Sequence, residues 1–186
     1  MDQTLRQYDE IIAKCKALFL KKHQDYGSSW RILRLPSITD QLYIKAKRIR
    51  SIEEKGVQQV HDPIEGEFMG LINYSIIALI QLELDEDALI ELSHDQVEKL
   101  YDENVAIVRT LMMQKNHDYG EVWREMRVSS MTDLILTKLL RIKQIEDNKG
   151  STLVSEGAGP NYMDIINYAI FALIKLDETT TSGITN

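Results

Sequence analysis

The chain contains one ten-residue pattern twice, and this internal repeat most limits what it can fold into. The stretch KHQDYGSSWR begins at Lys22, and KNHDYGEVWR begins ninety-three residues later, at Lys115. The flanking segments also match, for example INYSIIALIQL with INYAIFALIKL, after a one-residue shift near Lys55 and Lys149. About two positions in five are identical, more than chance gives for repeats of this length. The sequence therefore predicts a tandem duplication of one structural unit.

Each unit is predicted to form three α-helices, because apolar residues recur at helical spacing and no strand-like alternation occurs. The third helix is apolar almost all round, which is typical of a central, buried helix. The fold class is therefore all-α, with two tandem three-helix repeats in a pseudo-two-fold bundle. The predicted helices cover 4–24, 37–56 and 67–83 in the first repeat, and 94–117, 130–150 and 161–177 in the second.

Capping residues and glycines set these boundaries. Ser93 precedes Gln96 by three positions, the pattern of a capping box. A serine three residues before an aspartate, at Ser37 and Ser130, predicts the start of each second helix in the same way. Glycines are predicted to end the first and second helices, at Gly27, Gly56, Gly120 and Gly150.

One compact unit with four parts is expected. These parts are a first repeat over 1–83, a linker helix over 84–93, a second repeat over 94–178 and a flexible polar tail over 179–186.

Composition narrows the class of protein. With 44% hydrophobic and 27% charged residues, the chain reads as soluble and globular. Its net charge of -7 argues against binding to nucleic-acid polymers or anionic membranes. The longest apolar run, LINYSIIALI, is too short to cross a bilayer, and the N-terminal segment lacks the apolar stretch of a signal peptide. A cytoplasmic protein is expected. The single cysteine, Cys15, excludes an intramolecular disulfide.

Several repeated polar and aromatic residues are candidates for ligand binding. Asn73 and Asn167 lie within the most apolar helices, where a buried amide must find partners, either as a polar lock between the repeats or on a ligand. Trp30 and Trp123 follow the repeated glycines, where a tryptophan either fills a core edge or stacks on a nucleobase.

The first helices end on carboxylates, each followed by a tyrosine. Asp25 and Asp118 are disfavoured there by the helix dipole, so a compensating cation is expected. One interpretation is an Asp–Arg bridge. The other is that nearby cations hold a triphosphate, with Asp25, Tyr26, Asp118 and Tyr119 also contacting it. These cations are spaced three apart and so share a helix face; they are Lys45, Arg48, Lys138 and Arg141.

Acidic residues near the third helices are candidate metal ligands. Mg²⁺, or Mn²⁺ in its place, takes oxygen ligands and commonly binds carboxylates together with substrate phosphates. A solvated acidic loop is the alternative. The candidates are Asp62, Glu65 and Glu67 in the first repeat, and Glu156 and Asp164 in the second.

The Lys-x-x-Asp-Tyr-Gly corner, the Lys-x-x-Arg helix and the Asp-x-x-Asn-Tyr-Ala helix resemble the domain of unknown function 1599 family, also termed nucleotide modification associated domain 1. That family is similar in turn to the MazG-like all-α nucleoside triphosphate pyrophosphohydrolases. The resemblance implies Mg²⁺-dependent cleavage of the α–β phosphoanhydride to a nucleoside monophosphate and pyrophosphate. Where the family pattern places an acid three residues before the helix asparagine, this chain has Gly70 and Asp164.

Three functions are therefore open. The first is a Mg²⁺-dependent nucleoside triphosphate pyrophosphohydrolase. The second is a nucleotide-binding or regulatory protein without catalysis, and the third is a helical scaffold. The expected partner in the first two is a nucleoside triphosphate or a similar phosphorylated small molecule. Pairing of two chains is a further expectation, because relatives assemble such bundles from separate chains.

Overall fold

The order of the helices repeats itself along the chain, as the sequence predicted. The computed structural model describes residues 2–56, 63–84, 88–154 and 156–183. All regular structure in this part of the chain is helical, which confirms the all-α prediction. The elements are α1 (Asp2–Tyr26), η1 (Ser29–Ile32), α2 (Leu35–Lys55), α3 (Ile64–Glu83), α4 (His94–Tyr119), η2 (Val122–Glu125), α5 (Val128–Asp147) and α6 (Ala158–Gly183).

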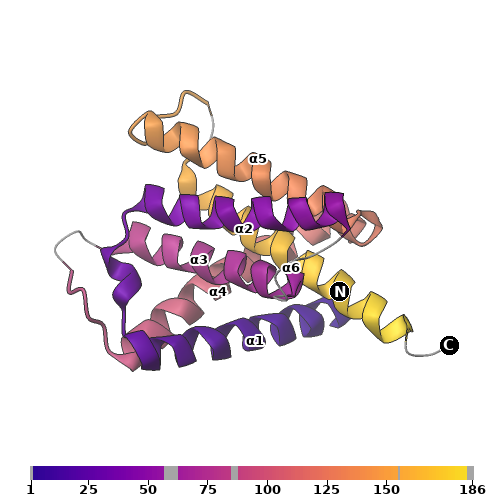
Figure 1. Cartoon of the computed structure of the whole chain (residues 1–186), viewed down its shortest axis with the longest axis horizontal. Helices are drawn as coiled ribbons and strands as arrows, with labels where there is room; N and C mark the ends of the chain where they lie inside the picture. The colour runs from indigo at the N-terminus through magenta and orange to yellow at the C-terminus, as the bar shows by residue number, and fades with distance from the viewer. Residues whose placement is uncertain (1, 57–62, 85–87, 155, 184–186) are drawn as a thin grey trace.

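The two third helices, α3 and α6, lie against each other at the centre of the molecule (Figure 1). Helices α2 and α5 cover one side of this pair, and α1 and α4 pack on the other. Each first helix packs on the third helix of the other repeat at least as extensively as on its own. The two repeats therefore share one core.

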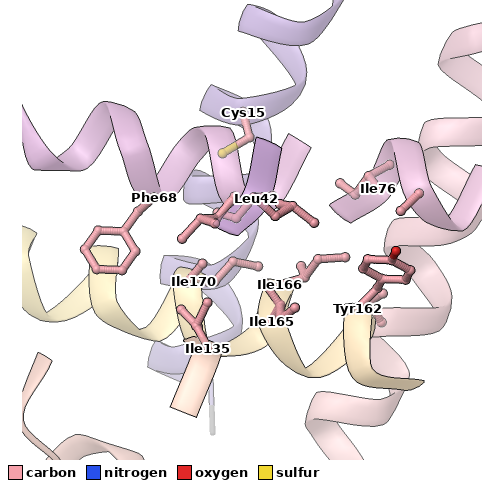
Figure 2. Close-up of a cluster of buried hydrophobic side chains, with 14 of the residues drawn as sticks. Cys15, Leu42, Phe68, Ile76, Ile135, Tyr162, Ile165, Ile166 and Ile170 are labelled. Carbon is pink, nitrogen blue, oxygen red and sulfur yellow. The ribbon is translucent and has the colours of Figure 1, made fainter. Parts of the chain in front are cut away.

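Apolar side chains of α3 and α6 fill that core, as their sequences predicted. Phe68 and Ile76 of α3 and Ile166 of α6 are fully buried. Figure 2 shows them gathered with Leu42 of α2 and Cys15 of α1. Fully burying one such side chain contributes about 1.5–3 kcal/mol, so this shared core holds the repeats together. None of the helices in the described part of the chain has the length and apolar character of a membrane span.

Three of the four predicted glycine helix ends are confirmed, at Gly27, Gly56 and Gly120, whereas Gly150 is not an end, because α5 stops at Asp147 with Asn148 as its cap. Gly27 and Gly120 follow α1 and α4 with φ of 60° and 68°, a left-handed conformation that glycine adopts without steric cost. The capping box at the start of α4 is also present. The Ser93 side chain accepts from the Gln96 backbone N–H, and the Gln96 side chain accepts from the Ser93 backbone N–H.

The predicted caps of the second helices are wrong. Helices α2 and α5 begin at Leu35 and Val128, two residues before the serines that were expected to cap them. Ser37 and Ser130 therefore lie within the first turn, and their backbone N–H groups donate to the carbonyls of extended Arg34 and Arg127. A Ser-x-x-Asp pattern can also lie inside the first turn of a helix. Here the helices start earlier, directly after Arg34 and Arg127, whose backbone is extended.

The linker and the tail also differ from expectation. Residues 88–93 run without helical structure, so the described part of the predicted linker helix is absent, and residues 85–87 lie outside the described part. Helix α6 continues to Gly183 through most of the predicted tail, and residues 184–186 lie outside the described part. Thr179 and Thr180 donate their hydroxyl hydrogens to the Leu176 carbonyl within this last stretch.

Candidate functional site

A cavity lies at the equivalent place in each repeat, where the end of the first helix meets the 3-10 helix and the second and third helices. The cavity of the first repeat, termed the first pocket, has a volume of about 180 Å³. The cavity of the second repeat, termed the second pocket, has a volume of about 380 Å³. Repeat-equivalent residues line both: Lys22 and Lys115, Tyr26 and Tyr119, Trp30 and Trp123, Lys45 and Lys138, Asn73 and Asn167, and Tyr74 and Tyr168.

The buried asparagines at the pocket floors lock the two repeats together. Asn73 Nδ2 donates to the Cys15 carbonyl at 3.1 Å, and its Oδ1 accepts from the Tyr101 hydroxyl at 3.0 Å. Asn167 Oδ1 accepts in the same way from the Tyr8 hydroxyl at 3.0 Å. Each asparagine thus bonds to the first helix of the other repeat. This geometry supports the polar-lock interpretation, and the asparagines also form part of the pocket walls.

The two tyrosines of this lock are held as neutral hydrogen-bond donors. Tyr8 and Tyr101 are completely buried. Burial raises the pKa of both hydroxyls far above the ordinary tyrosine value, because a phenolate is poorly solvated there. Their role is therefore structural.

Both tryptophans pack into the core at the edge of a pocket. Trp123 is buried and stacks on Phe171, with ring centroids 4.2 Å apart and an angle of 5° between the planes. Trp30 is half-buried, and its ring centroid lies 6.4 Å from that of Phe19, with the two rings tilted to each other. Both indole N–H groups are buried and lack a hydrogen-bond partner in the described part of the structure. The core interpretation of the tryptophans is thus supported, and each leaves a donor unsatisfied at a pocket wall.

A carboxylate bridges the two lysines of the second pocket. Asp164 is only 9% exposed, and its two oxygens lie 2.5 Å from Lys115 Nζ and 2.6 Å from Lys138 Nζ. The sequence singled out Asp164 and Lys138 but missed Lys115. The signal was available, since Lys115 and Lys22 are the first residues of the repeated ten-residue pattern.

The first pocket lacks this carboxylate because Gly70 stands at the position of Asp164. The Lys45 side chain lies over the glycine instead, and a Cβ built on Gly70 would be 2.9 Å from Lys45 Cδ and Cε. Lys45 Nζ is 3.5 Å from Glu67 Oε2, and Arg48 pairs with the other oxygen of the same carboxylate. The carboxylate that pairs with Lys45, that of Glu67, thus lies about one helical turn before the position equivalent to Asp164.

The sequence pattern of one family matches residues 22–82 and 115–176, which together cover about two thirds of the chain. The chain belongs to the nucleotide modification associated domain 1 family, also called domain of unknown function 1599. The two matched segments begin at Lys22 and Lys115 and contain all the lysine, tryptophan and asparagine pairs of the pockets. No curated protein and no solved structure shows significant similarity to the chain.

The predicted metal ligands of this family member do not come together. Glu67 pairs with Lys45 and Arg48 of the first repeat, whereas Asp164 pairs with Lys115 and Lys138 of the second. Glu65 lines an open groove with residues of α1 and α6, and Glu156 lines another beside α5. Asp62 lies outside the described residues. Within the described ranges, no three His, Cys, Asp or Glu side chains form a group that could hold a metal ion. A single carboxylate already bridged by two ammonium groups does not fit Mg²⁺, which usually takes one or two carboxylates together with substrate phosphates and waters.

The repeated corner residues lie at the pocket rims. Tyr26 and Tyr119 are 69% and 74% exposed. Asp25 and Asp118 are exposed as well, and Asp118 pairs with His117 Nδ1 at 3.1 Å. Among the residues that the structure describes, no arginine pairs with either aspartate, so the predicted Asp–Arg bridge is wrong. Arg141 is also exposed and faces the groove that holds Glu156.

Proposed function

We propose that this protein binds a nucleoside triphosphate or a similar phosphorylated small molecule at its repeat pockets. The observation that carries the proposal is the convergence of the repeated sequence pattern. Residues up to about fifty positions apart in each repeat meet at one cavity, twice, with the same two lysines, tryptophan, tyrosines and asparagine. Architecture alone requires the glycine corner and the asparagine lock, but it does not require a lysine pair at each cavity.

The chemistry of these side chains suits a phosphorylated aromatic ligand. Lysine ammonium groups form charge-assisted hydrogen bonds with phosphate oxygens. The exposed faces of Tyr26 and Tyr119 offer aromatic surface at the rims for a base. The unsatisfied indole N–H groups of Trp30 and Trp123 could donate to a polar atom of the ligand after a small local opening. Membership in a nucleotide modification family supports a nucleotide as the ligand.

Hydrolysis of the bound nucleotide to a monophosphate and pyrophosphate is the second candidate, and Asp164 is the observation that favours it. It is the one carboxylate lining either pocket among the described residues, and it lies between two cations. A metal-dependent reaction there would need Asp164 to exchange a lysine for the ion, because both oxygens are engaged.

The experiment that tests the proposal combines binding with turnover. Standard and base-modified nucleoside triphosphates are titrated by calorimetry in Mg²⁺, in Mn²⁺ and in EDTA, and pyrophosphate release is followed in parallel. Binding that is lost in the double variant Lys22→Ala, Lys115→Ala but kept in Lys99→Ala, an exposed lysine on α4, supports the proposal. Metal-dependent pyrophosphate release that is lost in Asp164→Asn supports hydrolysis as well. A folded protein that binds no member of the panel contradicts both and leaves the scaffold role.

A further inference from the structure

The two pockets differ in their charged residues, although many of their lining positions are repeat-equivalent. Among the residues that the structure describes, two lysines and one aspartate line the second pocket, whereas two lysines, one histidine (His23) and no acid line the first. The difference in carboxylates comes from one pair of equivalent positions, Gly70 and Asp164, and a second pair, His23 and Asn116, gives the first pocket an imidazole where the second has an amide. Glu67 offsets part of the positive charge near the first pocket but is also paired with Arg48.

The lysines of the second pocket are already engaged. Both ammonium groups lie within 2.6 Å of an Asp164 oxygen, and this carboxylate is almost completely buried. A phosphate entering the second pocket would have to approach that carboxylate or displace it from both lysines. Like charges at such distances repel strongly where water is excluded.

The lysines of the first pocket are differently placed. Lys22 is exposed and forms no ion pair with any other described residue. Lys45 lies 3.5 Å from a carboxylate that it shares with Arg48 and 5.7 Å from the centre of the Tyr74 ring, and its stem rests on Gly70, which has no side chain of its own. Because lysine has a long, flexible stem and Arg48 would remain paired with Glu67, Lys45 can turn from Glu67 to a ligand without leaving that carboxylate unpaired.

We propose that the phosphate of the ligand binds in the first pocket, between Lys22 and Lys45, and that Asp164 closes the second pocket to phosphate by acting as a built-in anion. This assignment rests on the function proposed above. It adds which pocket binds the ligand, how many ligands bind per chain and which residue keeps phosphate out of the other pocket. The chain then takes one phosphorylated ligand. In the second pocket the Asp164 carboxylate provides the negative charge that the phosphate of the ligand provides in the first pocket.

The chain offers a site-specific reporter for this assignment, because its two tryptophans lie one in each pocket. The protein is labelled with 5-fluorotryptophan, and its two ¹⁹F resonances are assigned from Trp30→Phe and Trp123→Phe. Inorganic pyrophosphate and a nucleoside triphosphate are then titrated separately. The expected result is that both ligands shift the Trp30 resonance and leave the Trp123 resonance in place, with one ligand bound per chain.

Matched variants sharpen the test. Lys22→Ala should weaken binding about tenfold, the loss expected for one charge-assisted contact to phosphate, whereas Lys99→Ala, which removes an exposed lysine outside both pocket linings, should change it less than about twofold. The exchange variant Gly70→Asp, Asp164→Asn should move the response to the Trp123 resonance. Lys22 is exposed, so Lys22→Ala remains informative even where the exchange variant does not fold.

Failure of this assignment is distinguishable from failure of the proposed function. A nucleotide that shifts the Trp123 resonance of the unaltered chain, alone or with Trp30, overturns the assignment and leaves nucleotide binding intact. Pyrophosphate that shifts Trp30 while no nucleotide does so supports the anion site and contradicts nucleotide binding. If neither ligand shifts either resonance, both proposals are overturned.

Discussion

The Tyr101 hydroxyl in α4 donates to Asn73 Oδ1 in α3 at 3.0 Å, so the second repeat supplies a hydrogen bond that the first repeat needs at its buried centre. Tyr8 and Asn167 form the same contact in the opposite direction, also at 3.0 Å. The repeats are therefore joined by a reciprocal pair of bonds rather than by apolar packing alone.

Removing one of these hydroxyls should destabilise the whole chain. Tyr101→Phe keeps the ring but leaves Asn73 Oδ1 buried without that donor, and we expect the free energy of unfolding to fall by about 1–3 kcal/mol. Urea denaturation measures the change. Tyr26→Phe removes an exposed hydroxyl and is the matched control. Equal stability of the two variants would show that the lock contributes nothing.

Replacing Gly70 should stabilise α3. Gly70→Ala gains about 1 kcal/mol of helix propensity, and the new Cβ meets only the flexible end of Lys45, which can move aside. Gly66→Ala is the control in the same helix, because a Cβ there has nothing within 4 Å. The difference between the two variants in thermal denaturation reports the cost of moving Lys45. A loss of stability at Gly70 alone would show that Lys45 is fixed on the glycine, contrary to the flexibility required for ligand binding.

Glu146 should make stability depend on pH above the ordinary glutamate range. Burial raises the pKa of Glu146 above its usual value of 4.5, against the opposing hydrogen bonds from Thr39 and Tyr162. The folded protein then holds a proton that the unfolded chain has lost, so stability rises as the pH falls from above the folded pKa toward 4.5. In Glu146→Gln this rise should shrink.

The control for Glu146 is an acid whose pKa moves the other way. The hydrogen bond from Arg50 lowers the pKa of Glu54, so the stability linked to Glu54 is lost only as the pH falls below 4.5. Glu54→Gln should therefore follow the unaltered chain at higher pH. Denaturation of all three proteins between pH 4.5 and 7 measures the effect, and parallel curves for Glu146→Gln and the unaltered chain would contradict it.

The single thiol should be unreactive in the folded protein. Cys15 is completely buried, and burial raises the pKa of its thiol to about 12, so almost no thiolate exists at neutral pH. Ellman's reagent should release no colour from native protein and one equivalent in guanidinium chloride. Rapid reaction under native conditions would show that α1 opens readily from the core.

Much of the architecture was predictable because the duplication presents each pattern twice. A helix, a glycine corner and a buried asparagine that recur at one offset are unlikely to be accidents of composition. The starts of α2 and α5 were misplaced because the two serines read equally well as cap and as first-turn residues. The helical tail was missed because threonines such as Thr179 are poor helix formers in isolation, and α6 extends through them from a packed core.

The site was harder to predict than the fold. Alignment of the repeats identifies Lys45 and Lys138 as equivalents but does not show which helix contacts which. The bond from Tyr8 to Asn167 joins residues 159 positions apart and crosses between the repeats. The pairing of Asp164 with Lys115 likewise depends on how α4 meets α6. Such contacts arise only when the tertiary arrangement is fixed.

Two separate copies of one such repeat, assembled as a symmetric pair, would be forced to place the same residue at both positions now occupied by Gly70 and Asp164. Covalent fusion removes that obligation. A single substitution then changes one pocket and spares its twin, while the reciprocal tyrosine–asparagine bonds still tie the altered half to the unaltered one. Division of labour between two halves of one molecule becomes accessible in single mutational steps.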